Sequence, residues 1–167
     1  MNKFLLRLSI YGTAALATLA AVAEDAAPAT GDITDLKQAL AEVPHAQAIA
    51  MRNAATRDAA ASQASDLLRT KVQGRNAKLT FKVDVVEKEM RGTETAYRVR
   101  AEEKHIAEVG TNFITYLWVH FATSENDKAS ALKKGGEISV TGKISEAFVT
   151  GKAAPALHIE LSQATVN

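Results

Sequence analysis

Along most of the sequence after Gly74, apolar and polar side chains alternate. Successive side chains of a β-strand point to opposite faces, so an apolar period of two predicts strands that are buried on one face. Glycine and proline residues separate the runs, as they do at turns. The runs that alternate in this way, or are apolar on both faces, are residues 79–85, 97–101, 113–121, 138–144 and 157–161. The sequence therefore predicts five strands in its last ~90 residues.

This number of strands limits the architecture. Five strands cannot form a seven-stranded sandwich, and no helices alternate with them as a parallel α/β sheet requires. A flat sheet would leave two edges open for pairing with other chains. We therefore expect a small, strongly bent barrel, with the polar residues 124–134 as an insertion between the third and fourth strands.

The residues before Gly74 have a helical pattern instead. Asp32 is placed to cap a first helix, whose apolar residues recur three and four positions apart, and Pro44 ends it. A longer helix is predicted over residues 45–72. Between residues 39 and 64, 11 of 26 residues are alanine, so this helix can approach another surface closely. That surface is either the chain's own barrel or a partner, which includes a second copy of the chain.

The first 23 residues have the features of a secretory signal peptide. A basic start is followed by an apolar stretch and by small residues at Ala21 and Ala23, so we expect cleavage after Ala23. The apolar stretch, residues 8–23, is interrupted and shorter than the roughly 20 apolar residues of a membrane-spanning helix. The mature protein is therefore expected to be soluble and periplasmic or secreted, with no membrane span.

Two segments resemble a known class of domain. Residues 132–144 read LKKGGEISVTGKI, similar to the passage from helix to fourth strand of OB-fold domains, and residues 157–166, LHIELSQATV, resemble the last OB strand. The resemblance is to the anticodon-binding-like OB modules of exported bacterial proteins and covers about residues 77–166. It implies a mainly β fold with some α, a five-stranded OB-like barrel. The expected organisation is a signal peptide at 1–23, a flexible leader at 24–32, an Ala-rich helical arm at 33–74 and the barrel domain at 75–167.

Composition excludes several kinds of site. The chain has no cysteine, which excludes disulfides, thiolate metal sites and cysteine nucleophiles. Its formal charge is +1, and removal of Lys3 and Arg7 with the signal peptide leaves 18 basic and 19 acidic residues, or −1. A protein that binds polyanions usually carries a clear positive excess, so nucleic acid is disfavoured as a partner.

No spacing of residues indicates catalysis. Glu137 stands where a phosphate-binding loop ending at Gly142 and Lys143 would need glycine, and no hydroxyl follows the lysine. The histidines show no zinc-binding spacing, and no nucleophile elbow is present. His158 and Glu160 share a strand face and are interpreted as a solvent-facing polar pair. We therefore expect no enzyme activity, no catalytic residues, no metal and no cofactor.

The run 113–121 provides the one informative surface. Its odd-numbered residues are assigned to the barrel interior, which leaves Tyr116, Trp118 and His120 on the outer face. Arg98 and Arg100 of the preceding strand are expected beside them. The resemblance places oligonucleotide or oligosaccharide binding on this part of an OB fold. Two alternatives remain: either the Ala-rich helix covers these rings, or they form an open ligand-binding face.

The leading hypothesis is a non-enzymatic, exported OB-fold binding or accessory protein whose partner is a protein or a polymer such as a cell-wall glycan. One alternative is single-stranded nucleic-acid binding through the outer face of the second and third strands. The other is a structural or assembly subunit that self-associates through the Ala-rich helix.

Overall fold

The computed structural model describes residues 31–106, 111–151 and 154–167. The predicted signal peptide and the leader up to residue 30 lie outside these ranges. The elements in chain order are α1 (Leu36–Ala41), α2 (His45–Ala50), α3 (Arg57–Lys71), β1 (Asn76–Lys82), β2 (Val85–Arg91), β3 (Glu94–Ile106), β4 (Asn112–Phe121), the 3-10 turn η1 (Thr123–Glu125), α4 (Asn126–Ser130), β5 (Glu137–Thr150) and β6 (Ala156–Val166). None of the helices in the described ranges is long and apolar enough to cross a membrane.

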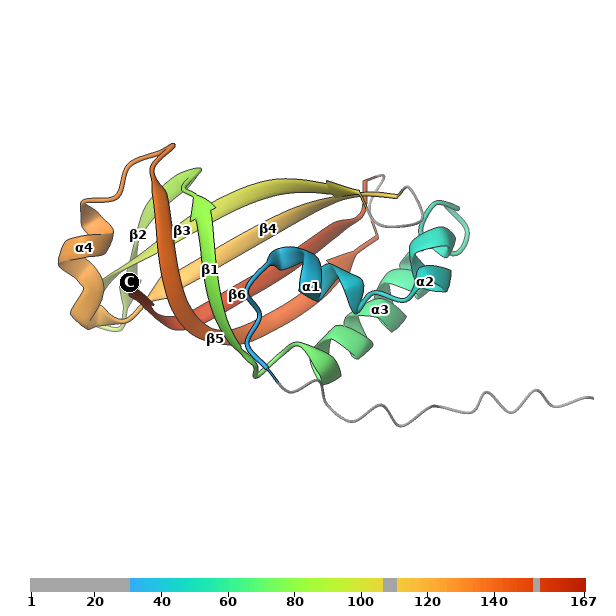
Figure 1. Cartoon of the computed structure of the whole chain (residues 1–167), viewed down its shortest axis with the longest axis horizontal. Coiled ribbons are helices and arrows are strands. Elements are labelled where there is room, and N and C mark those ends of the chain that lie inside the picture. The colour runs from blue at the N-terminus through green and yellow to red at the C-terminus, as the bar shows by residue number, and fades with distance from the viewer. Residues whose placement is uncertain (1–30, 107–110, 152–153) are drawn as a thin grey trace, which may run out of the picture.

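The strands form one six-stranded sheet in the order β1-β5-β6-β4-β3-β2. Neighbouring strands are antiparallel, except β4 and β6, which are parallel. The two ends of this order, β1 and β2, are consecutive in the chain, so the sheet curls round into a barrel (Figure 1). This is the connectivity of an OB fold, with β1 and β2 as the two halves of its first strand.

The prediction of five strands is wrong by one, because a bend divides the first predicted strand into β1 and β2 and the sheet has six strands. One continuous strand was expected over residues 79–85, because Val83 and Val85 continue its alternation. Instead, the Val83 amide donates to the Gly136 carbonyl at 2.9 Å, while the Asp84 amide donates to the Arg100 carbonyl at 2.9 Å. The chain thus leaves β5 and joins β3 within two residues. Alternating hydrophobicity does not report such a change of partner.

The interior of the barrel matches the predicted faces. The inward residues of β4 are all buried: Phe113, Thr115, Leu117, Val119 and Phe121. On β3, Val99 and Ala101 are buried and Tyr97 packs against the same core. The prediction of a mainly β fold with α, OB-like in its topology, is confirmed. The insertion at 124–134 contains α4, whose Ala129 joins the core.

The first helix begins later than predicted. Asp32 was expected as its cap, but the helix begins at Leu36, and the Asp35 carboxylate accepts from the Lys37 amide at 2.8 Å. The reason is that Ile33 pairs with the start of β1. The Ile33 amide donates to the Asn76 carbonyl at 2.9 Å, and its carbonyl accepts from Lys78.

The second predicted helix, residues 45–72, is interrupted after Ala50. Side chains at the start of α3 and just before it satisfy carbonyls at the end of α2, since the Thr56 hydroxyl donates to the Ala50 carbonyl at 2.7 Å and the Arg57 Nε donates to the Met51 carbonyl at 3.0 Å. The Asn53 side chain accepts from the Ala55 amide at 2.9 Å. Such hydrogen bonds between side chains and nearby backbone groups compete with the backbone bonds of a helix. The high alanine content predicted a continuous helix and gave no sign of them.

Helix α3 lies against the edge of β5 (Figure 1). Strand β1 pairs with β5 only as far as Lys143, so the rest of β5 to Thr150 has no strand on that side among the described residues. The short side chains of Ala60, Ala61 and Ala64 are buried there. The Ser65 hydroxyl accepts from the Val149 amide at 2.9 Å and lies 3.2 Å from the Val149 carbonyl. A helix thus covers an edge that would otherwise expose unpaired backbone groups.

Removing the Ser65 hydroxyl should destabilise the fold. Ser65→Ala leaves the Val149 amide without its bond, so we expect the free energy of unfolding in urea to fall by about 1–2 kcal/mol. Ser62→Ala is the matched control, since Ser62 is exposed on the same helix and gains the same helix propensity. Equal stabilities of the two variants would contradict this role for Ser65.

Candidate functional site

The candidate site is the outward side of the sheet where β3, β4, β6 and β5 lie next to one another. Pairing places Arg100, Trp118 and Glu160 in one cross-strand row. The next row contains Glu102, Tyr116, His158 and Phe148. We call the surface formed by these two rows, together with Arg98 and His120, the outer face.

The outer face brings together the residues predicted as a site. The Arg98 guanidinium lies over the Trp118 ring at 4.5 Å from its centroid, and that of Arg100 lies at 5.7 Å. A cation above an indole is attracted to the ring's negative face. The two arginines therefore restrain the orientation of Trp118, which is partly buried.

The rings of His158 and Phe148 extend this surface. The sequence analysis did not predict that either ring belongs to it. His158 is stacked on Phe148 with ring centroids 4.6 Å apart and planes at 1°, and it lies 5.2 Å from Tyr116. Trp118, Tyr116, His158 and Phe148 thus form a series of partly buried rings across three strands, which we call the aromatic row. The alternation of β5 would have placed Phe148 opposite the buried Ala147 and Val149, and that was the available signal.

Each arginine of the outer face has an acidic partner from the bend or from β2. Arg98 pairs with Glu87 at 2.6 Å, and Arg100 pairs with Asp84 at 2.7 Å. Lys134 also lies 3.0 Å from Asp84. The hydrogen bond that Arg100 donates, and then that from Lys134, lowers the pKa of the Asp84 carboxyl, and the same bond to Asp84 raises the pKa of Arg100. The positive charge of the two arginines is therefore largely compensated within the chain.

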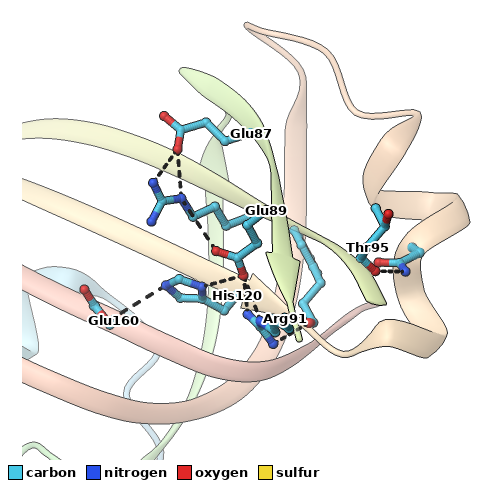
Figure 2. A network of polar contacts seen from close by, with 9 residues as sticks. Glu87, Glu89, Arg91, Thr95, His120 and Glu160 are labelled. Atoms are coloured by element: carbon cyan, nitrogen blue, oxygen red, sulfur yellow. Dashed lines mark hydrogen bonds and ion pairs between the residues drawn. The ribbon is translucent and has the colours of Figure 1, made fainter. Parts of the chain in front are cut away.

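His120 lies in a second network of charges at the end of the outer face nearest α4 (Figure 2). Its Nδ1 is 3.1 Å from Glu89, and its Nε2 is 3.9 Å from Glu160. Glu89 also pairs with Arg91 at 2.6 Å. Burial raises the pKa of the Glu89 carboxyl, but the hydrogen bonds from His120 and Arg91 outweigh it, so that this pKa is lowered overall.

This network predicts a loss of stability in acid. Because the pKa of Glu89 is below its ordinary value of 4.5 in the folded state, the unfolded chain takes up the proton first as the pH falls. The stabilisation is complete above the ordinary pKa and is lost as the pH falls through the lower, folded value. We therefore expect the free energy of unfolding in urea to fall as the pH decreases below about 5, with a smaller fall in Glu89→Gln.

The fall should be smaller in Glu89→Gln rather than absent, since the pKa values of Asp84 and Glu125 are also lowered. Glu137→Gln, at the exposed start of β5, is the control and should keep the wild-type profile. A Glu89→Gln profile parallel to that of the wild type would show that the network does not stabilise the fold.

One of the two predicted alternatives was that the Ala-rich helix covers the rings of Tyr116 and Trp118. The helices of the structure pack in other places. Helix α3 contacts β5, and α1 packs through Leu36, Ala39 and Leu40 into the barrel core. Figure 1 shows α2 and α3 at the end of the barrel opposite α4, whereas the His120 network lies near α4 (Figure 2). The contacts of Trp118 and Tyr116 described above are with β3 and β6. No group of three or more acidic or histidine side chains in the described ranges is placed to hold a metal ion.

Comparison with known proteins gives only distant likenesses. No protein-family model and no curated protein matches the sequence. One similar solved structure is a lipoprotein of Klebsiella pneumoniae subsp. pneumoniae MGH 78578 described as a candidate nucleic acid-binding protein, with 12% identity over 81% of this chain and 91% of that one and a TM-score of 0.41. Another is a small single-stranded DNA-binding protein of Streptomyces coelicolor, with 10% identity over 56% of this chain and 94% of that one and a TM-score of 0.35.

Proposed function

We propose that this chain is an exported, non-enzymatic binding protein that holds a polymeric partner on its outer face. The pattern of residues 1–23 supports export. The observation that carries the binding function is that Tyr116 and Trp118 lie on the sheet face away from the core, beside Arg98 and Arg100, while α3 packs on β5. Tryptophan, tyrosine and arginine are the residues most enriched at the energetic centres of binding surfaces.

The face is suited to an extended partner. The rings of Tyr116, His158 and Phe148 follow one another across β4, β6 and β5, and Trp118 lies two residues along β4 from Tyr116. At the β5 end, Phe148 also lines a pocket with Ser62 and Asp66 of α3. Rings in such a series can pack against successive units of a chain molecule. The ion pairs beside Trp118 hold its ring in place before binding, which reduces the entropy lost on association.

Single-stranded nucleic acid is the second candidate, favoured by the two guanidinium groups over Trp118. The compensation of both arginines by Glu87 and Asp84 argues against it. Titration with a short oligonucleotide at several salt concentrations separates the cases, because binding through phosphate contacts weakens steeply as salt rises. Self-association through the Ala-rich helix is not supported, since Ala60, Ala61 and Ala64 are buried against the chain's own barrel.

Capture from a periplasmic extract tests the proposed function. The immobilised wild-type protein, Trp118→Ala and Ile49→Ala are compared, and the retained proteins, saccharides and nucleic acids are identified. Ile49 is an exposed apolar residue of α2, away from the outer face, so its variant controls for nonspecific adhesion. We expect one partner that the wild type and Ile49→Ala retain and Trp118→Ala loses. Equal retention by all three proteins would contradict binding on the outer face.

A further inference from the structure

The charges on the outer face restrict the chemistry of its partner. The acidic side chains on and around it are Asp66, Asp84, Glu87, Glu89, Glu102, Glu146 and Glu160, and the basic ones are Arg69, Lys82, Arg91, Arg98, Arg100, Lys104 and Lys134. Acidic groups are thus at least as numerous as basic ones. A surface of this kind has no positive field with which to hold a polyphosphate or another polyanion.

The ion pairs beside Trp118 also have a specific hydrogen-bonding character. Arg98 with Glu87, and Arg100 with Asp84, each place guanidinium N–H donors next to carboxylate acceptors, at 2.6 Å and 2.7 Å. A hydroxyl group donates one hydrogen bond and can accept two, so neighbouring hydroxyls match such a pair without bringing a charge. Glu160 and Glu102, next to Trp118 and Tyr116 in the register, supply further acceptors.

The aromatic row provides the apolar part of the same chemistry. One face of a pyranose ring carries mainly C–H groups, which pack on indole and phenol rings, while its hydroxyls point sideways toward polar neighbours. Trp118 and Tyr116 are two residues apart on one strand face, so their rings lie at two successive positions along β4. A sugar ring at Trp118 has to pack on the part of the indole that Arg98 and Arg100 leave uncovered. Polar groups flank these rings on β3 and β6.

We infer that the partner on the outer face is an uncharged glycan strand, with successive sugar rings packed on Trp118 and Tyr116 and their hydroxyls bound by the flanking ion pairs and carboxylates. This inference rests on the proposed function and names the class of its partner. The balanced charges of the outer face favour a glycan over nucleic acid, because the arginines that would bind phosphate are already paired with Glu87 and Asp84.

Trp118 is the only tryptophan of the chain, so tryptophan fluorescence reports on this face alone. The probes are a neutral hexamer of β-1,4-linked N-acetylglucosamine and a ten-residue oligothymidylate. We expect a saturable fluorescence change with the hexamer that is nearly independent of salt, and none with the oligonucleotide. Tyr116→Ala keeps the reporter and should weaken hexamer binding by about tenfold, as expected for the loss of one aromatic packing partner. Ile49→Ala should bind like the wild type.

Two results would overturn the inference. One is the absence of a saturable response to the hexamer. The other is a response to the oligonucleotide that exceeds the response to the hexamer and falls steeply with salt. If either occurs while capture of a partner still depends on Trp118, the glycan inference fails and the proposed function stands. If capture does not depend on Trp118, the proposed function itself fails.

Discussion

Trp118→Ala is expected to abolish partner binding while leaving most of the stability of the fold in place. The ring is partly buried, and its identified partners are the guanidinium groups of Arg98 and Arg100 on the same face. Losing these contacts should lower the free energy of unfolding by about 1–2 kcal/mol. Affinity for the captured partner should fall by about 30-fold or more, as at a central aromatic residue of an interface.

Phe113→Ala is the matched control for stability, because Phe113 lies on the same strand with its side chain in the core and has no exposed surface. Its truncation leaves a cavity and should cost about 3–5 kcal/mol in urea unfolding. A comparable loss of stability in Trp118→Ala would mean that Trp118 is a core residue. The outer face would then not be a free surface.

The second large effect concerns the packing of the helical segment on the barrel. Leu68 of α3 is fully buried in the same core as the barrel residues, so Leu68→Ala should lower the free energy of unfolding by about 2–5 kcal/mol. Leu67, next to it, is only partly buried and should cost clearly less when replaced by alanine. Because one core joins α3 and the barrel, we expect one cooperative transition, followed by far-UV circular dichroism and by Trp118 fluorescence.

The two probes report different parts of the molecule, since the ellipticity includes the helices and the only tryptophan lies on the sheet. Coincident urea midpoints in both leucine variants would support a single folding unit. A helical transition at lower urea than the fluorescence transition would instead show that residues 33–74 fold separately from the barrel.

The sequence predicted those strands correctly whose apolar and polar residues alternate regularly and whose neighbouring strands do not change along the strand. β4 is the best example, because β3 and β6 pair with most of its length and its alternation continues through the register shift between Val119 and Phe121 in the pairing with β6. The split at Val83 and Asp84 was missed because the change of hydrogen-bond partner leaves the apolar pattern intact. The break after Ala50 was missed because it depends on polar side chains that bond to carbonyls six residues away.

The candidate site was predicted only in part for a related reason. Tyr116, Trp118 and Arg100 are close because adjacent strands set their distance, and alternation alone places them on one face. The pairing of Glu87 and Asp84 with Arg98 and Arg100 depends on the bend before β2 and on the register of β2 against β3. Phe148 and His158 meet through the β5–β6 register. The alternation of apolar and polar residues does not predict which residues of two neighbouring strands pair with each other.

The central claim, that the outer face holds a partner, is tested most directly by site-specific photo-crosslinking in living cells. A benzoylphenylalanine residue is introduced at Tyr116 in one strain and at Ile49 in another, and irradiation is followed by electrophoresis and mass spectrometry. We expect a defined adduct of higher mass from position 116 and none from position 49. An adduct from position 49 alone, or the same adduct from both positions, would contradict the claim.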